Sequence, residues 1–193
     1  MEIIALSGFA RSGKDEVAKI LVEDCGFMRV AFADKLREVL YALDPICGHS
    51  YYDKSPDLIT VQDVIDKYGW NGYKETEYGQ EIRRLLQRLG TEAGRQTLWD
   101  SIWIDAALTG LPEDARIVVS DARFINEFEA VRSRGGEIWR INRPGVGPAN
   151  DHASEMEAVG YNFDLTINND TTLGELRITV CNLITIAEQE SGL

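Results

Sequence analysis

A glycine-rich segment near the start of the chain has the residue types and spacing of a phosphate-binding loop. It fits the pattern G-x-x-x-x-G-K, in which four residues separate two glycines and a lysine follows the second glycine. Glycines let the backbone curl so that several N–H groups face one anion, and the lysine adds a positive charge for the outer phosphates. The pattern predicts a site for nucleotide phosphates whose members are Gly8, Ala10, Arg11, Ser12, Gly13 and Lys14.

Carboxylates stand where this kind of site needs a metal. The position after the lysine usually carries Ser or Thr, whose hydroxyl binds Mg²⁺, but here it is Asp15, followed by Glu16. A carboxylate can bind Mg²⁺ directly or through water. Asp121 follows an apolar run at 116–120, where a metal-organising acid is expected in a phosphate-loop protein. We expect Asp15 and Asp121 to hold Mg²⁺, with Glu16 beside the phosphates.

The basic residues are unevenly placed in an acidic chain. The net charge is −12, yet ten of the fourteen arginines fall between Arg83 and Arg143. A broad basic face, which duplex DNA requires, is therefore not expected, although modified DNA stays open as a substrate. An arginine-rich middle within an acidic chain favours a small anionic ligand in a local pocket.

Alternating strand and helix patterns surround these residues. The apolar run 2–6 precedes the loop, and helical spacing follows it. A second strand at 29–33 ends in Asp34 and leads into a helix at 35–43, and a longer helix is expected over 76–94. Further strands are expected at 116–120, 137–141 and 163–167, with Thr171 capping a terminal helix. This order predicts an α/β fold in which a five-stranded parallel sheet has helices on both faces.

The 193 residues suit one domain, with two segments that interrupt the regular pattern. An insertion at about 44–95 holds one short helix near Val61 and is expected to bind substrate, and a loop at about 143–158 resembles a lid. His152 in that loop is interpreted as a structural hydrogen-bonding group. No apolar run is long enough to span a bilayer, and three cysteines without paired spacing predict neither zinc nor a disulfide framework. A cytoplasmic location without membrane contact is expected, and a homodimer is left open.

Taken in order, several short motifs resemble one family. They are the loop with Asp15, Phe32-Ala33-Asp34, the run 86–95, Asp121-Ala122-Arg123-Phe124 with Asn126-Glu127, Arg143-Pro144-Gly145 and His152-Ala153-Ser154-Glu155. The chain thereby resembles the phage-type deoxynucleoside monophosphate kinases, in the adenylate-kinase-like branch of phosphate-loop kinases. The resemblance implies a three-layer P-loop fold, ATP and Mg²⁺ as cofactors, and a small nucleotide as substrate.

Cations are the main requirement of such a reaction, because the acceptor phosphate is already ionised near neutral pH. We expect Arg95 and Arg123 to bind the acceptor phosphate or the transferring group, and Arg143 to close over ATP. The groups expected to act in catalysis are Lys14, Arg11, Asp34, Arg95 and Arg123. Those expected to bind substrate are Asp34, Lys35, Arg83, Arg88, Arg95, Arg123, Asn126, Glu127 and Glu155.

Two other functions fit the same residues. A phosphate-loop kinase could act on a hydroxyl, in a 5-hydroxymethyl-pyrimidine of DNA or of a nucleotide, or in dephospho-coenzyme A. That chemistry needs a base, and Asp34 at the end of a strand would be placed for it. A nucleotide-binding module without turnover is the other alternative.

Overall fold

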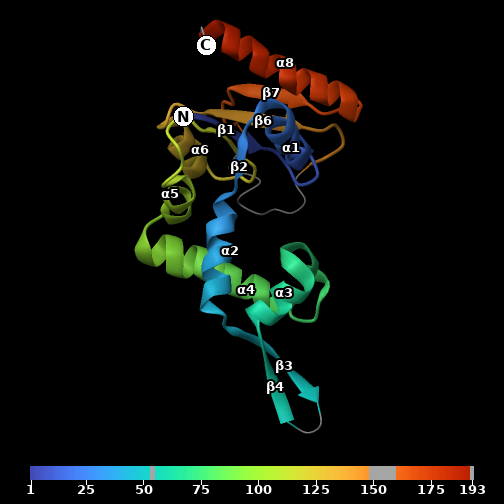
Figure 1. The fold of residues 1–193 in the computed structure, drawn as a ribbon, viewed down its shortest axis with the longest axis vertical. Coiled ribbons are helices and arrows are strands. Elements are labelled where there is room, and N and C mark those ends of the chain that lie inside the picture. Colours follow the sequence, from blue (N-terminus) through green and yellow to red (C-terminus); the bar gives the residue numbers. More distant parts are fainter. Residues whose placement is uncertain (53–54, 148–159, 192–193) are drawn as a thin grey trace. The chain divides into compact units, whose positions relative to one another are not determined.

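The computed structural model describes residues 1–52, 55–147 and 160–191, and the chain divides into two compact units. The first unit combines Met1–Phe32 with Ala107–Leu193, and the second is the continuous segment Ala33–Ala106. Figure 1 shows the elements of each unit. The second unit extends beyond the insertion expected at about 44–95.

The first unit is built on a sheet of five parallel strands (Figure 1). Its strands are β1 (Glu2–Ser7), β2 (Met28–Val30), β5 (Arg116–Val119), β6 (Glu137–Asn142) and β7 (Leu165–Asn168). The spatial order is β2-β5-β1-β6-β7, so the loop-bearing strand lies in the centre. Residues 3–7 of β1 are all buried, as expected for a parallel strand that is covered on both faces.

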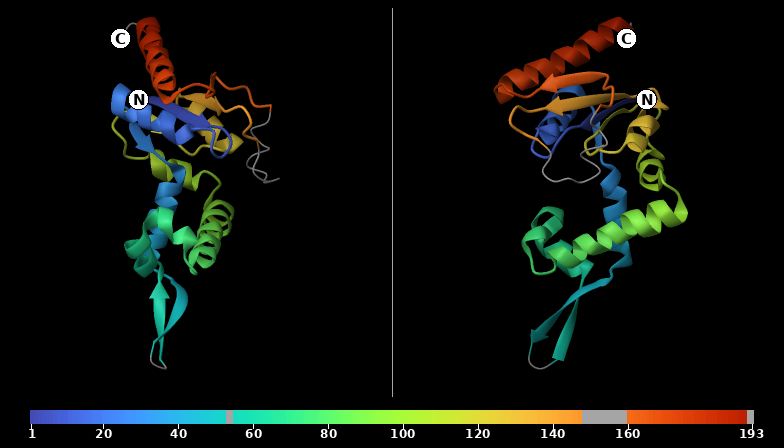
Figure 2. Two further views of the ribbon diagram at one scale, coloured as in Figure 1. Left: turned by 90° about the vertical axis from the view of Figure 1, so that its right-hand side faces the viewer. Right: turned by 180° about the vertical axis from the view of Figure 1, so that it is seen from behind.

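Helices cover the two faces of this sheet. On one face α1 (Lys14–Cys25) and α8 (Leu173–Ser191) lie side by side (Figure 2), and Leu6, Val17 and Val180 belong to the core beneath them. On the other face α6 (Ile125–Arg132) packs against β1 and β6, with Phe128 and Val131 fully buried. The predicted α/β fold with a parallel sheet between helices is confirmed.

The second unit contains helices and a β-hairpin. Its elements are α2 (Phe32–Leu43), which starts at the last residue of the first unit, β3 (Ile46–Tyr52), β4 (Ser55–Thr60), α3 (Val61–Gly72), the short 3₁₀ turn η1 (Tyr73–Glu75), α4 (Gly79–Gln87), the π-helix η2 (Arg88–Leu98) and α5 (Ile102–Leu108). Leu40, Val61 and Ile82 form its core together with neighbouring apolar residues. The hairpin β3–β4 was not expected from the sequence, which predicted only the helix near Val61.

The helix expected over 76–94 is divided. It begins at Gly79, and from Arg88 the backbone widens into the π-helix η2. Trp103 explains the change, because its indole Nε1 donates to the Gly90 carbonyl at 2.9 Å. A Cβ on Gly94 would lie 2.8 Å from the same indole, so glycine is required for this approach. A tertiary contact therefore sets the local geometry.

Two element boundaries differ from the sequence expectation. The second strand ends at Val30 rather than at residue 33, so Asp34 lies in the first turn of α2 and not at a strand end. The cap of α8 is Thr172 rather than Thr171. Thr172 Oγ1 accepts a hydrogen bond from Glu175 N, and the Glu175 carboxylate accepts one from Thr172 N, which lowers the pKa of Glu175. Within the described ranges, no helix combines the length and apolarity needed to cross a membrane.

Candidate active site

The loop between β1 and α1 has the backbone of a tight anion cradle. Gly8 and Gly13 have positive φ angles of 144° and 102°, and Arg11 also has a positive φ, 66°. A Cβ on Gly8 would lie 2.3 Å from the backbone oxygen of Ile141 in β6. The loop therefore closes against the neighbouring strand, and only glycine fits at its start.

Lys14 brings a positive charge to this loop. It is the first residue of α1, and its Nζ donates hydrogen bonds to the carbonyl oxygens of Gly8 at 2.7 Å and Phe9 at 2.9 Å. The side chain thus folds back over the start of the loop. The partial positive charge of the α1 N-terminus adds to the lysine, so the cradle favours an anion.

Ser12 places a hydroxyl inside the loop. The residue is 1% exposed, and its Oγ has no hydrogen-bond partner among the described residues. A buried hydroxyl without a partner costs about 1–3 kcal/mol. Such a group is expected where a ligand supplies the missing hydrogen bond.

Asn169 was not predicted from the sequence, yet it supports the loop. Its amide Nδ2 donates to the Ser12 carbonyl at 2.8 Å, and a Cβ on Gly13 would lie 2.2 Å from that nitrogen. The Asn169 N–H donates to Asn142 O at 2.7 Å, which ties the residue to the end of β6. A signal was present, since Asn169 directly follows the last strand at the edge where ligands bind in parallel sheets.

Three carboxylates follow the loop in the chain, two directly after it and one at the end of β5. Asp15 is exposed and Glu16 half-buried in the first turn of α1, where negative side chains suit the helix dipole. Asp121 follows β5, the strand next to β1, and its Oδ1 accepts a hydrogen bond from Phe32 N at 2.9 Å. No group of three or more metal-binding side chains occurs in the described residues. Mg²⁺ in nucleotide sites needs only one or two carboxylates beside the phosphates, so this donor set fits it.

The segment after Asp121 is ordered by a buried acid. Glu127 is 3% exposed, and its Oε2 accepts hydrogen bonds from the backbone N–H groups of Arg123 at 2.7 Å and Phe124 at 3.1 Å. The Arg123 side chain is exposed, and Asn126 is half-buried. Glu127 thus has a structural role that fixes the backbone from which Arg123 extends.

The expected lid is described only at its start. Arg143 is exposed and begins a turn in which its carbonyl accepts from Val146 N at 3.1 Å. His152 and Glu155 lie outside the described residues. In the first unit the loop, Asp121, Arg123 and Arg143 therefore all lie at the carboxyl edge of the sheet.

The remaining expected residues belong to the second unit. Asp34 forms an ion pair with Arg37 at 2.9 Å. Lys35 pairs with Glu38, Arg88 pairs with Glu92, Arg83 is exposed, and Arg95 is half-buried in η2. All five residues belong to the second unit, and the phosphate loop belongs to the first. That they act together with the loop stays a prediction.

Comparisons with known proteins identify relatives of the chain. The family model for deoxynucleotide monophosphate kinase matches residues 57–180. A relative from Acanthamoeba polyphaga mimivirus is 27% identical and covers 98% of this chain and 99% of its own. The deoxynucleotide monophosphate kinase of Enterobacteria phage T4 is 23% identical, and the match covers 96% of this chain and 100% of the relative. The deoxynucleoside-5′-monophosphate kinase of Escherichia phage T5 is 26% identical, and the match covers 67% of this chain and 71% of the relative. Among solved structures, a dephospho-CoA kinase from Campylobacter jejuni matches over 100% of this chain and 99% of its own, with 13% identity and a TM-score of 0.44. Because the family model matches more than half of the chain, this protein belongs to the deoxynucleotide monophosphate kinase family.

Proposed function

We propose that this protein transfers the γ-phosphoryl group of ATP to a deoxynucleoside 5′-monophosphate. An oxygen of the acceptor phosphate forms the new bond to the γ-phosphorus, the bond from the γ-phosphorus to the bridging oxygen breaks, and ADP leaves with the released electron pair. The acceptor oxygen is already ionised near neutral pH, so no general base is required. The observation that carries the proposal is the glycine loop with Lys14 and the buried Ser12 hydroxyl at the carboxyl edge of the sheet.

The residues of the loop would bind and orient the donor. Backbone N–H groups from Gly8 to Gly13 and the charge of Lys14 favour the β- and γ-phosphates. Ser12 Oγ would gain the hydrogen bond that the described residues do not supply. Asp15 and Asp121 would hold Mg²⁺, which neutralises charge on the phosphate oxygens when it is bound.

Arginines would organise the acceptor and the transferring group. Arg123 extends from a backbone that Glu127 fixes, and Arg143 begins the segment that would cover ATP. Arg95 would bind the acceptor phosphate or the transferring group. A hydroxyl acceptor is less favoured. It would need Asp34 as the general base, and the Asp34 carboxylate forms an ion pair with Arg37.

The proposal is tested by ADP release from ATP and Mg²⁺ across a panel of acceptors. The panel holds the four common deoxynucleoside monophosphates, their ribonucleotide counterparts, 5-hydroxymethyl variants, dephospho-coenzyme A and hydroxymethylated DNA. Diphosphate products seen by mass from free monophosphates support the proposal. Activity on a hydroxyl acceptor alone, or ATP binding without any transfer, would overturn it.

Lys14→Ala is the first variant to compare in this assay. Removing a preorganised cation from a phosphoryl-transfer site should lower kcat by about 10²–10³. Lys19→Ala is the matched control, since Lys19 lies on the same helix, 61% exposed and 3.9 Å from Glu23. Full activity of Lys14→Ala would show that the loop is not the site of transfer.

A further inference from the structure

Two thiols of the first unit lie close together although they are far apart in the sequence. Cys25 is the last residue of α1, and Cys181 lies within α8, 156 positions later. The Cys25 Sγ donates a weak hydrogen bond to the Cys181 Sγ, with the two sulfur atoms 3.8 Å apart. Both residues are free cysteines. The fold thus creates a dithiol pair that the spacing of cysteines along the sequence does not reveal.

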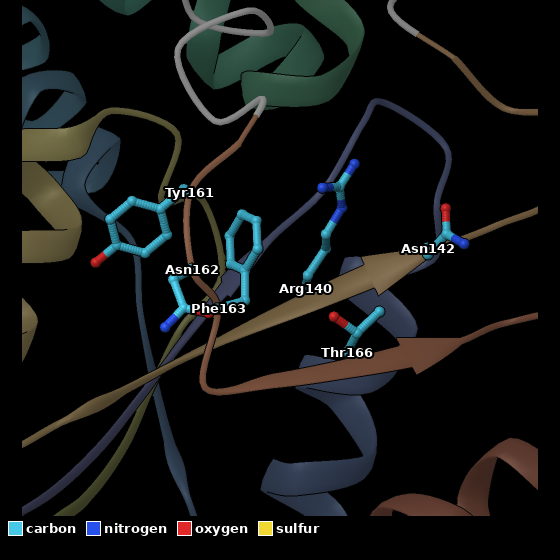
Figure 3. Close-up of a pocket in the computed structure, with 6 residues that line it drawn as sticks. All are labelled: Arg140, Asn142, Tyr161, Asn162, Phe163 and Thr166. Carbon is cyan, nitrogen blue, oxygen red and sulfur yellow. The ribbon is translucent and has the colours of Figure 1, made fainter.

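The thiols belong to the packed side of the sheet. On the side where α6 packs, Arg140 extends from β6 beside a pocket of about 430 Å³ (Figure 3). Side chains alternate along a strand, so the neighbours Trp139 and Ile141 point to the opposite side, where they belong to the core beneath α1 and α8. Cys25 and Cys181 both pack against that core. Close packing therefore limits how far the two thiols can separate.

Ion pairs hold α1 and α8 together on both sides of the thiols. Arg177, one turn before the thiol of α8, donates from Nη2 to Asp24 at 2.8 Å, and Asp24 directly precedes Cys25. Arg116 of β5 donates to the Cys25 carbonyl at 3.0 Å and forms an ion pair with Glu188 of α8 at 2.9 Å. Since these contacts tie both helices to the same neighbours, the two thiols are preorganised as a pair.

The geometry allows a bond between the two sulfur atoms. A disulfide needs them about 2.0 Å apart. Rotation about one Cα–Cβ bond moves a sulfur by roughly 3 Å between staggered positions, so side-chain rotation can supply the approach. Cys25 and Cys181 are half-buried, which leaves them accessible to a small oxidant.

The surroundings of the pair keep it reduced at neutral pH. Burial and the hydrogen bond to Cys181 raise the pKa of the Cys25 thiol to about 11. The charge of Asp24 acts in the same direction, and that of Arg116 opposes it. Because the thiolate is the reactive form, an added oxidant and mildly alkaline pH are needed for rapid reaction.

We propose that Cys25 and Cys181 form a site of reversible oxidation, at which a peroxide converts the two thiols into a disulfide that joins α1 to α8. One thiolate attacks the O–O bond of the peroxide, which breaks to give a sulfenic acid, and the leaving hydroxide takes up the proton that the thiol released. The second thiolate attacks the sulfenic sulfur, the S–O bond breaks, and a second water forms in the same way. Two thiols and one hydrogen peroxide thus give one disulfide and two waters, and two electrons pass from sulfur to oxygen. A small-molecule thiol reverses the reaction by exchange.

The disulfide would strengthen the part of the first unit that holds the phosphate loop. Lys14 begins α1, and Asn169, which bonds to Ser12 O, lies just before α8. A cross-link between residues far apart in the sequence removes much freedom from the unfolded chain. Oxidation should therefore raise the temperature at which the protein unfolds.

The test uses the full-length protein with a small excess of hydrogen peroxide at mildly alkaline pH. Free thiols, counted after denaturation, should fall from three to one. Trypsin without reductant should release peptides 20–29 and 178–193, which hold Cys25 and Cys181, as one linked species two hydrogens lighter than their sum. The oxidised protein should unfold about 5–15 °C above the reduced protein, and dithiothreitol should restore the original thiol count and Tm.

Three variants locate the effect. Cys25→Ser and Cys181→Ser should each keep two thiols and show no rise in Tm. Cys47→Ala is the matched control, because it removes the buried thiol of the second unit, and it should still form the linked peptide with the same rise. Oxidation to sulfinic acids without the linked peptide, or a disulfide between two molecules on non-reducing electrophoresis, overturns the proposed pair. A linked peptide in a protein whose Tm does not rise overturns its stabilising role.

Discussion

Replacing Gly13 by alanine would place a methyl group where the side-chain amide of Asn169 now lies. The new Cβ would be 2.2 Å from Asn169 Nδ2 and 3.4 Å from Asn169 Cγ, and among the described residues beyond the two chain neighbours no other side chain comes within 4 Å. An amide at the end of a side chain can rotate away, but it then loses its hydrogen bond to Ser12 O. The positive φ of 102° adds backbone strain that the rotation does not relieve.

These two effects give the magnitude. Strain in the left-handed region costs roughly 1–2 kcal/mol, and a lost hydrogen bond costs about 1 kcal/mol, so Gly13→Ala should lower the free energy of unfolding by about 2–3 kcal/mol. Asn169→Ala alone should lower it by about 1 kcal/mol. Because both changes remove the same hydrogen bond, the double variant should cost no more than Gly13→Ala alone. The sum of the losses in unfolding free energy for the two single variants should therefore exceed the loss for the double variant by about 1 kcal/mol.

Urea unfolding of the four proteins measures this difference. Gly26→Ala provides the reference for strain alone, since Gly26 has a φ of 72° at the other end of α1 and its added Cβ would meet no described residue beyond its chain neighbours within 4 Å. Gly26→Ala should lower the free energy of unfolding by about 1–2 kcal/mol, the strain alone, because it breaks no hydrogen bond. The loss of unfolded-chain entropy on replacing glycine by alanine is the same as in Gly13→Ala. If the double variant loses the full sum of the two single changes, Asn169 does not support the loop in the way described.

Two further changes test other parts of the structure. Glu127→Gln should lower the free energy of unfolding by about 1–3 kcal/mol in urea titrations, because a buried carboxylate that accepts from Arg123 N and Phe124 N is replaced by a weaker, neutral acceptor. An unchanged unfolding midpoint would contradict the structural role assigned to this acid. Burial raises the pKa of Cys47 to about 11, so folding resists its ionisation. The associated stability should be complete below the ordinary thiol pKa of about 8.5 and decline as the pH rises from there through about 11, and Cys47→Ala should flatten that decline in unfolding curves taken across this range. A decline of equal steepness in Cys47→Ala would assign it to other groups.

Features encoded by neighbouring residues were predictable from the sequence. The strand, the glycine loop and the first helix are adjacent in the chain, and their residue types alone favour the observed backbone at Gly8 and Gly13. The parallel sheet followed from the alternation of short apolar runs with helical patterns. Both depend on interactions over a few residues, which a single sequence displays directly.

Features that depend on distant contacts were not predictable. The second strand stops early, and the N–H of Phe32 at the start of α2 donates to Asp121, far along the chain. The π-helix exists because Trp103 bonds to Gly90. Asn169 supports the loop because the strand order places β6 beside β1 and β7 beside β6, and no local pattern gives that order.

The position of β1 in the sheet has a consequence for biosynthesis. The strand that carries the phosphate loop leaves the ribosome first, but its two hydrogen-bonding partners begin at Arg116 and Glu137, more than a hundred residues later. The second unit is one continuous segment made in between, so it can begin to fold while β1 still lacks its neighbours. Nucleotide binding is thus acquired only after most of the chain has been made, and an aborted translation product that ends before β6 carries the complete loop sequence without the strand that closes the loop.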